Sequence, residues 1–199
     1  MVQAIQLAHI PSDLTLFVAL YRDVKNAAFL REQLLAGNTD FEYAFIDAST
    51  VISTKHALAA AFRAINDYLN DRLKSRNVHS ETVYALSPNN NIGEAFRRFG
   101  VSETTKDLLV MKIATQIQIT QESVTRHLGD NIQGEEVPFE DRSIQDISDI
   151  NRIKKIYKIA PPPARKGNKQ VAGDSGISKD QTSNLEVQIL GAMALRGAT

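Results

Sequence analysis

The chain has 199 residues, of which 43% are hydrophobic and 23% are charged, and its 23 Lys and Arg residues are balanced by 23 Asp and Glu residues. This composition is that of an ordinary folded globular protein, and the zero formal net charge excludes a uniformly basic nucleic-acid coat. Because the chain contains no cysteine, disulfide frameworks, thiolate zinc sites, iron–sulfur clusters and cysteine nucleophiles are excluded. No apolar run approaches the roughly 18 residues that a membrane span needs, and the first ten residues lack the basic start of a secretory signal. We therefore expect a soluble intracellular protein without membrane contact.

Three segments near the start of the chain have the pattern of strands. They are rich in β-forming residues and cover residues 4–10, 14–21 and 41–47. The first two are separated by Pro-Ser-Asp, which is turn chemistry, so they are predicted to pair as a hairpin. Between the second and third, helical spacing over residues 23–36 ends at Gly37, where a left-handed helix stop is expected.

The clearest helical pattern follows Ser53, a good N-cap residue, and is predicted to continue to about residue 74. Large apolar residues spaced by four, three and four predict one buried stripe along this helix. The stripe consists of Leu58, Phe62, Ile65 and Leu69. The opposite face, predicted to be solvated, carries Lys55, His56, Arg63, Asn66, Asn70 and Lys74.

The middle of the chain continues the alternation of strand and helix patterns. In chain order the predictions are a strand over 81–86, a short helix over 92–99 ended by Gly100, a strand over 106–113, a helix over 120–128 ended by Gly129, and a helix over 144–159. By periodicity alone, such alternation predicts an α/β layered domain and usually favours parallel strands.

Residues 160–182 interrupt this pattern with three consecutive prolines, several Gly and Ser residues and almost no large apolar group. They are predicted to be a flexible linker or an inserted loop, followed by one last helix over residues 185–195. The expected organisation is a single α/β domain over 1–160, a linker over 161–182, and a C-terminal segment over 183–199 whose helix packs back on the domain and on a partner.

Charge is unevenly distributed within the neutral total. Residues 135–149 hold six acidic residues against one Arg, whereas residues 150–173 hold seven Lys or Arg residues and no acidic one. A basic stretch of this kind can follow a phosphate backbone, but solvated linkers are often basic as well. Both interpretations stay open for residues 150–173.

The motifs of common catalytic sites are absent. The sequence has no GxxxxGK phosphate loop, GxGxxG fingerprint or HExxH zinc motif, and its four histidines are scattered. The tetrapeptide Gly173-Asp174-Ser175-Gly176 matches the serine-nucleophile motif of trypsin-like proteases, but it lies in the predicted linker without the accompanying histidine motif. We therefore expect no catalytic residue, metal site or cofactor.

Residues 86–100, LSPNNNIGEAFRRFG, form the most informative segment. Asn91 is placed to cap the short helix, while Arg97 and Arg98 are expected to point outward beside an amide-rich turn. Exposed amides at a helix start near arginines can form a phosphate or nucleotide cradle. A plain capped corner between two elements is the alternative.

This segment resembles a known family, the kinase-binding subunit of the KEOPS complex (EKC in eukaryotes), also called the PRPK-binding protein family. Its members carry a run similar to LSPNNNIxEAxxxFGIS, which continues here as Gly100-Val101-Ser102. The resemblance covers nearly all of residues 1–160 and the last helix, and it excludes the 160–182 segment. The other matching segments are residues 17–26 (FVALYRDVKN), 47–64, 153–158 and 189–196.

The resemblance implies a mixed, largely antiparallel sheet of about four to five strands flanked by helices, that is, an α/β fold of α+β type. It implies a non-catalytic subunit that binds and influences the atypical kinase/ATPase of the complex, and meets the other subunits through it. It further implies contact with the single-stranded CCA end of tRNA during threonylcarbamoyl transfer to the adenosine next to the anticodon. Links to telomere maintenance and transcription, and a location in nucleus and cytoplasm, belong to the same complex.

The last helix has apolar residues on two sides when its residues are placed about 100° apart. One side carries Leu185, Ile189, Ala192 and Met193, and the other carries Val187, Leu190 and Ala194. A terminal helix cannot easily bury both sides in its own domain, and a partner groove would cover the second side. The alternative is a helix buried deep in its own core. Together with the resemblance, the pattern assigns partner contact to Ile189, Leu190, Met193, Ala194 and Leu195.

Single-stranded RNA ends are held by basic grooves that also offer stacking or apolar contacts to the bases. Residues at the positions of the family's motifs could supply this mixture, and we predict tRNA contact for Lys55, His56, Asn91, Ile92 and Arg97. The competing function is a small ligand- or nucleotide-binding α/β domain, or an enzyme, that uses the Asn-rich corner as an anion site.

Overall fold

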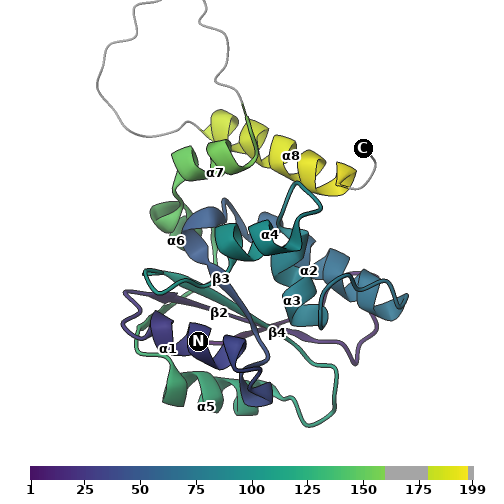
Figure 1. The fold of residues 1–199 in the computed structure, drawn as a ribbon, viewed down its shortest axis with the longest axis vertical. Helices are drawn as coiled ribbons and strands as arrows, with labels where there is room; N and C mark the ends of the chain where they lie inside the picture. The colour runs from purple at the N-terminus through teal and green to yellow at the C-terminus, as the bar shows by residue number, and fades with distance from the viewer. Residues whose placement is uncertain (160–178, 197–199) are drawn as a thin grey trace, which may run out of the picture.

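The computed structural model describes residues 1–159 and 179–196 (Figure 1). A central sheet separates two layers of helices, and the helices at the C-terminal end of the chain lie furthest from the sheet. Within the described residues the strands are β1 (Gln3–Ile5), β2 (Leu16–Arg22), β3 (Ala44–Asp47), β4 (Leu108–Ile113) and β5 (Glu135–Val137). The α-helices are α1 (Ala27–Leu35), α2 (Thr54–Leu69), α3 (Val78–Ala85), α4 (Ile92–Phe99), α5 (Gln121–Asn131), α6 (Asp141–Ile147), α7 (Ile150–Ile156) and α8 (Lys179–Leu195).

Every strand pairing found in the described residues is antiparallel, in the order β1-β2-β4-β3, with β5 also on β2. β1 pairs with the start of β2 and β5 with its end, so the two short strands share the edge opposite β4. The predicted mixed α/β fold with a largely antiparallel sheet is therefore confirmed, as is the pairing of the opening hairpin, although its first strand covers Gln3–Ile5 instead of residues 4–10. The parallel arrangement that periodicity alone favours is wrong.

The sheet is buried on both faces, which gives the domain two cores. Alternate residues of β2 face opposite sides, so that Leu16, Val18 and Leu20 belong to one core and Phe17, Ala19 and Tyr21 to the other. The first core packs under α2, α3 and α8, and the second lies under α1 and α5. Since both faces are apolar, the strand shows no alternation of polar and apolar residues.

Residues 81–86, predicted as a strand, lie in and just after helix α3. Asn77 caps this helix by accepting a hydrogen bond from the Ser80 amide at 2.8 Å. All but one of the eight residues of α3 are buried, so the helix has no polar face and its period of 3.6 is hidden. A short apolar run of this kind cannot be assigned to helix or strand from periodicity.

The boundaries of α2 and its buried stripe differ from the prediction. Ser53 caps the helix through a hydrogen bond from the His56 amide, as expected, but the helix ends at Leu69. Its buried side is made mainly of small residues, whereas Phe62 and Leu69 are 38% and 44% exposed. The fully buried positions are His56, Ala57, Ala60, Ala61, Ala64 and Ile65. Alanine permits close packing of a helix, so the core-facing side of α2 is not the side with the largest residues.

Several helix ends also differ from the sequence-based boundaries. The predicted helix over 144–159 is split into α6 and α7, because Ser148 donates to the Val51 carbonyl at 2.5 Å and Asp149 caps α7. Gly129 lies inside α5 instead of ending it. Gly37, in contrast, has a φ of +70° after α1, which is the predicted left-handed stop. Strand β5 was not expected from sequence, because its two glutamates are exposed on a sheet edge.

The predicted linker lies outside the described residues up to residue 178, and so does the tetrapeptide at residues 173–176. Residues 179–182 already belong to α8. No helix in the described parts of the chain is both long and apolar enough to cross a membrane.

Candidate functional site

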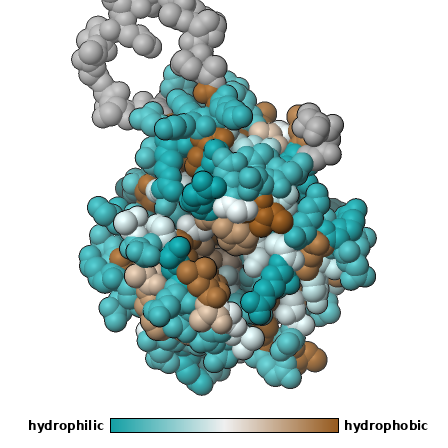
Figure 2. All heavy atoms as spheres, in the orientation of Figure 1, coloured by the Kyte–Doolittle hydropathy of each residue, from teal (hydrophilic) through white to brown (hydrophobic). Residues whose placement is uncertain are grey.

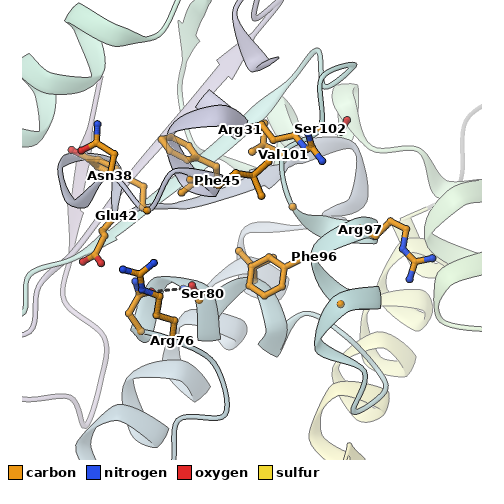
Figure 3. A pocket seen from close by; sticks show the side chains of 18 residues that line it. Arg31, Asn38, Glu42, Phe45, Arg76, Ser80, Phe96, Arg97, Val101 and Ser102 are labelled. Atoms are coloured by element: carbon orange, nitrogen blue, oxygen red, sulfur yellow. Dashed lines mark hydrogen bonds between the residues drawn. The ribbon is translucent and has the colours of Figure 1, made fainter. Parts of the chain in front are cut away.

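A pocket of about 470 Å³ opens between α1, α3 and α4, beside the start of β3. Figure 2 shows the surface hollowed between α1 and α4, with apolar atoms on either side. Phe96 of α4 points into the pocket and is 37% exposed (Figure 3). Tyr43, Phe45 and Val83 line it as well. The pocket therefore offers apolar and aromatic surface within reach of solvent.

The charged side chains of this pocket are mostly basic. Arg31, Arg76 and Arg97 line it against a single carboxylate, Glu42. The guanidinium of Arg31 pairs with Glu103 at the rim, at 2.9 Å between Nη1 and Oε1. Arg76 lies on the side of Glu42, whereas Arg97 is at the opposite edge with its guanidinium directed outward (Figure 3). The arrangement provides cations around an aromatic wall.

The Asn-rich corner before α4 is a closed hydrogen-bond network. Asn91 caps α4, as predicted, by accepting from the Glu94 amide at 2.9 Å. The side chain of Asn89 accepts from the Asn91 amide at 3.0 Å and donates to the Glu94 carboxylate at 2.9 Å. Glu94 also pairs with Arg98, which donates to the Ile156 carbonyl at 3.2 Å. The backbone amides of Asn91 and Glu94, which an anion would need, therefore already donate to side chains. The bond from Arg98 to Ile156 shows that this corner fixes α4 beside α7.

His56 is fully buried, so its predicted place on the solvated face of α2 is wrong. Its Nδ1 accepts a hydrogen bond from the Ile52 amide at 3.3 Å, and its Nε2 lies 2.9 Å from the Tyr157 hydroxyl, which donates to the Leu86 carbonyl. Burial lowers the pKa of His56 to about 4. A neutral, enclosed imidazole cannot hold an RNA phosphate.

The five residues predicted to contact tRNA do not form one surface. Lys55 pairs with Glu186 of α8, at 2.9 Å between Nζ and Oε2, on the α8 side of α2. Of the five residues, only Arg97 lines the pocket, and Asn91 and Ile92 begin the helix that carries it. The sequence missed Arg31, Arg76 and Phe96 as pocket residues, because they come from separate elements whose meeting point no local motif indicates.

α8 has one buried and one exposed side, as the two apolar stripes suggested. Leu185, Ile189 and Met193 belong to the core, with Ile189 fully buried. On the other side Val187 and Leu195 are 67% and 63% exposed. Ile189 and Met193, predicted to contact a partner, are therefore enclosed by their own chain. Of the predicted partner residues, Ala194 and Leu195 are accessible, and Leu190 is half-buried against the core.

The C-terminal end of α8 is held by two arginines. Arg63 of α2 donates to the carbonyls of Met193 and Arg196, the latter at 3.2 Å. The Arg196 side chain is buried, donates to the Tyr84 carbonyl and lies over the Tyr84 ring, 3.9 Å from its centroid. These contacts fix the rotation of α8, so the side that carries Val187 stays outward.

No group of three or more His, Asp or Glu side chains within residues 1–159 and 179–196 is placed to hold a metal ion. The pocket and the outward side of α8 are thus two surfaces of the described structure that offer binding chemistry. One combines cations with aromatic rings, and the other is an apolar helix face.

Comparison with known proteins gives a consistent result over nearly the whole chain. A family model described as "Kinase binding protein CGI-121" matches residues 21–197. The "EKC/KEOPS complex subunit cgi121" of Aspergillus terreus is 56% identical over 197 residues, covering 99% of this chain and 97% of that protein. The subunit of the same name from Coccidioides immitis is 47% identical, covering 100% and 99%, and that of Schizosaccharomyces pombe is 35% identical, covering 72% and 82%. The chain belongs to the CGI-121 family of kinase-binding proteins.

Proposed function

We propose that this chain is a non-catalytic subunit of an EKC/KEOPS complex, in which it binds the atypical kinase/ATPase and helps to recruit tRNA. The tRNA would be the substrate for threonylcarbamoyladenosine modification next to the anticodon, with its single-stranded CCA end bound by this subunit. The names and the high coverage of the relatives support membership of the complex. The observation that carries kinase binding is the exposed apolar side of α8 in a protein of a kinase-binding family.

The outward side of α8, defined by Val187, Ala194 and Leu195 with half-buried Leu190 at its edge, is the proposed kinase-binding face. Val187 and Leu195 are each more than half exposed although they lie on a helix anchored at its end by buried Arg196. An amphipathic helix commonly binds a partner by laying such a face into a groove. Full burial of each large apolar side chain would stabilise the complex by roughly 1.5–3 kcal/mol.

The double variant Val187→Glu/Leu195→Glu is expected to weaken association with the purified kinase at least about 100-fold, because two charges would enter an apolar contact. Calorimetric titration of the full chain with the kinase measures this. The matched control is Ile117→Glu, since Ile117 is 95% exposed on a loop and should leave affinity unchanged. Both variants should keep the melting temperature of the parent, and full kinase affinity of the double variant would contradict the proposed face.

For tRNA, the pocket between α1, α3 and α4 is a better candidate than the surface predicted from sequence. Single-stranded ends bind through stacking on aromatic rings together with cations that follow the backbone. Phe96 supplies an exposed ring, and Arg76 and Arg97 supply charge on two sides. The volume of about 470 Å³ falls within the roughly 300–1,000 Å³ of ligand pockets, which suits a terminal nucleotide and is too small for a duplex.

Phe96→Ala is expected to weaken binding of a tRNA that ends in CCA by roughly 5- to 100-fold, the effect of losing one stacked base. Arg76→Glu should also reduce the dependence of affinity on salt, because one phosphate contact is lost. Fluorescence anisotropy with intact tRNA and with tRNA lacking its last three nucleotides measures both effects. Both variants should lose discrimination between the two RNAs, whereas Arg126→Glu, on the exposed face of α5, should retain it. Unchanged discrimination by Phe96→Ala and Arg76→Glu would exclude this pocket.

A further inference from the structure

A second hollow, of about 480 Å³, lies beside the C-terminal end of α8. The loop that connects α2 to α3 forms its open side, since Arg72 and Lys74 of this loop line the hollow and are exposed. We call the hollow the basic groove, and its lining residues are Phe62, Arg63, Asn66, Asp67, Arg72, Lys74 and Arg196. Four of these side chains are cationic and one is a carboxylate, so positive charges exceed negative ones by three.

Two of the four cations are fixed in place by bonds to neutral groups. Arg63 donates to the last carbonyls of α8, and Arg196 donates to the Tyr84 carbonyl. Neither contact neutralises the guanidinium charge. Burial, and next to it the neighbouring Arg63, lower the pKa of Arg196, while Tyr84, Glu81 and Asp67 act in the opposite direction. The side chain nevertheless stays protonated, as arginine does in proteins.

The single carboxylate of the basic groove is shared. Asp67 lies 3.5 Å from Arg72 and 4.0 Å from Arg63, measured between side-chain N and O atoms. Lys74 is exposed, and it has no ion pair within residues 1–159 and 179–196. The open side of the groove therefore carries two accessible cations, Arg72 and Lys74, in front of two fixed ones.

We propose that the basic groove receives an acidic side chain of the kinase partner, a Glu or Asp next to the apolar surface that covers α8. This inference rests on the proposed kinase binding. It adds that the kinase presents a carboxylate at the C-terminal end of the kinase-binding face. Continuity supports it, because Arg196 of the groove directly follows Leu195 of the kinase-binding face. Phe62, 38% exposed, adds an apolar wall beside the charges.

A protein carboxylate fits the basic groove better than an RNA phosphate. An RNA backbone is bound through several phosphate contacts at once, each of which needs a cation that is free of other partners. Here Arg63 already directs both terminal nitrogens at α8 carbonyls, and Arg72 already has a partner in Asp67. The ammonium group of Lys74 and the exposed ring of Phe62 stay available. They suit a single acidic side chain that pairs with Lys74 and is desolvated against Phe62.

The double charge reversal Arg72→Glu/Lys74→Glu is expected to weaken kinase association about 10-fold or more and to reduce its dependence on salt. Both residues are exposed, so the fold and its melting temperature should be preserved. The matched control is Lys25→Glu/Arg126→Glu, which changes the net charge equally at exposed sites away from the groove and should stay within about twofold of the parent.

Three comparisons separate this inference from the proposed function. If Arg72→Glu/Lys74→Glu keeps full kinase affinity while Val187→Glu/Leu195→Glu loses it, the proposed role of the basic groove is overturned. The proposed kinase binding then stands. Unchanged affinity of both double variants would overturn both. Weaker tRNA binding with unchanged kinase binding would assign the groove to RNA and overturn the inference.

Cross-linking of the assembled complex of the full chain and the kinase identifies the partner carboxylate directly. A carbodiimide condenses an ammonium group with a carboxylate in contact, with loss of water to the reagent. We expect Lys74 to become linked to a Glu or Asp of the kinase, and the linked peptides to be identified by mass spectrometry. Cross-links from Lys25 but none from Lys74 would contradict the inference.

Discussion

Replacement of Ile189 by Asp is expected to lower the free energy of unfolding by at least about 3 kcal/mol, because it places a charge at a fully buried position of α8. Val187→Asp, two residues earlier on the exposed side, is the matched control and should change stability by less than about 0.5 kcal/mol. Urea unfolding followed by circular dichroism measures both.

The same pair of variants separates the two faces of the helix in binding. Ile189→Asp should reduce kinase affinity only in proportion to the fraction of unfolded protein or detached α8, whereas Val187→Asp should reduce it with the fold intact. Comparable stability of the two variants would show that α8 does not pack through Ile189, and the assignment of its inward and outward faces would then be reversed.

The two faces of α8 illustrate what the sequence could and could not provide. The helical wheel separated Leu185 and Ile189 from Val187 correctly, because that separation depends only on spacing. Which face is inward depends on the shape of the surface beneath it. Nothing in residues 185–195 indicates that Tyr84 and Arg63 hold the end of the helix through Arg196.

The fold was predictable where a local signal decides the structure. The hairpin follows from its turn, the start of α2 from Ser53 and the stop of α1 from Gly37. The predictions failed where burial removes the signal. α3 is buried at all but one position, so its sequence predicts a strand. The polarity of His56 predicts a surface residue, although Tyr157 satisfies that polarity inside the core.

The candidate site shows the same limit. The LSPNNNI segment offers the amides of an anion site in sequence, yet its side chains bond to its own backbone and to one another and fix α4. The position of α4 in turn directs Phe96 into the pocket. Arg31 and Arg76 come from elements on the other sides of that pocket. Their convergence depends on how α1 and α3 pack, so no reading of local motifs could have identified them.

The last prediction concerns Glu81, which is fully buried and holds the loop that carries Arg72 and Lys74. One of its carboxylate oxygens, Oε2, accepts hydrogen bonds from the Lys74 amide at 3.0 Å and from the amide and hydroxyl of Ser75 at 2.8 and 2.7 Å. Glu81→Ala leaves the two amides without a protein partner, whereas the Ser75 hydroxyl keeps its bond to the Asn77 carbonyl at 3.3 Å. We expect a loss of about 2 kcal/mol or more of stability, since each unsatisfied buried group costs roughly 1–3 kcal/mol and these two amides are partly buried.

Glu81→Gln tests whether the hydrogen bonds of residue 81 to the loop or its negative charge stabilise the protein. The amide oxygen of Gln can accept from the same donors, so most of the stability should return, with a remaining loss of about 1 kcal/mol. Hydrogen exchange of residues 72–77 should be fast in Glu81→Ala and close to the parent in Glu81→Gln. Because this loop forms the open side of the basic groove, kinase affinity should follow the exchange rates. A Glu81→Ala protein with slow loop exchange and parental stability would show that the loop is held by other contacts.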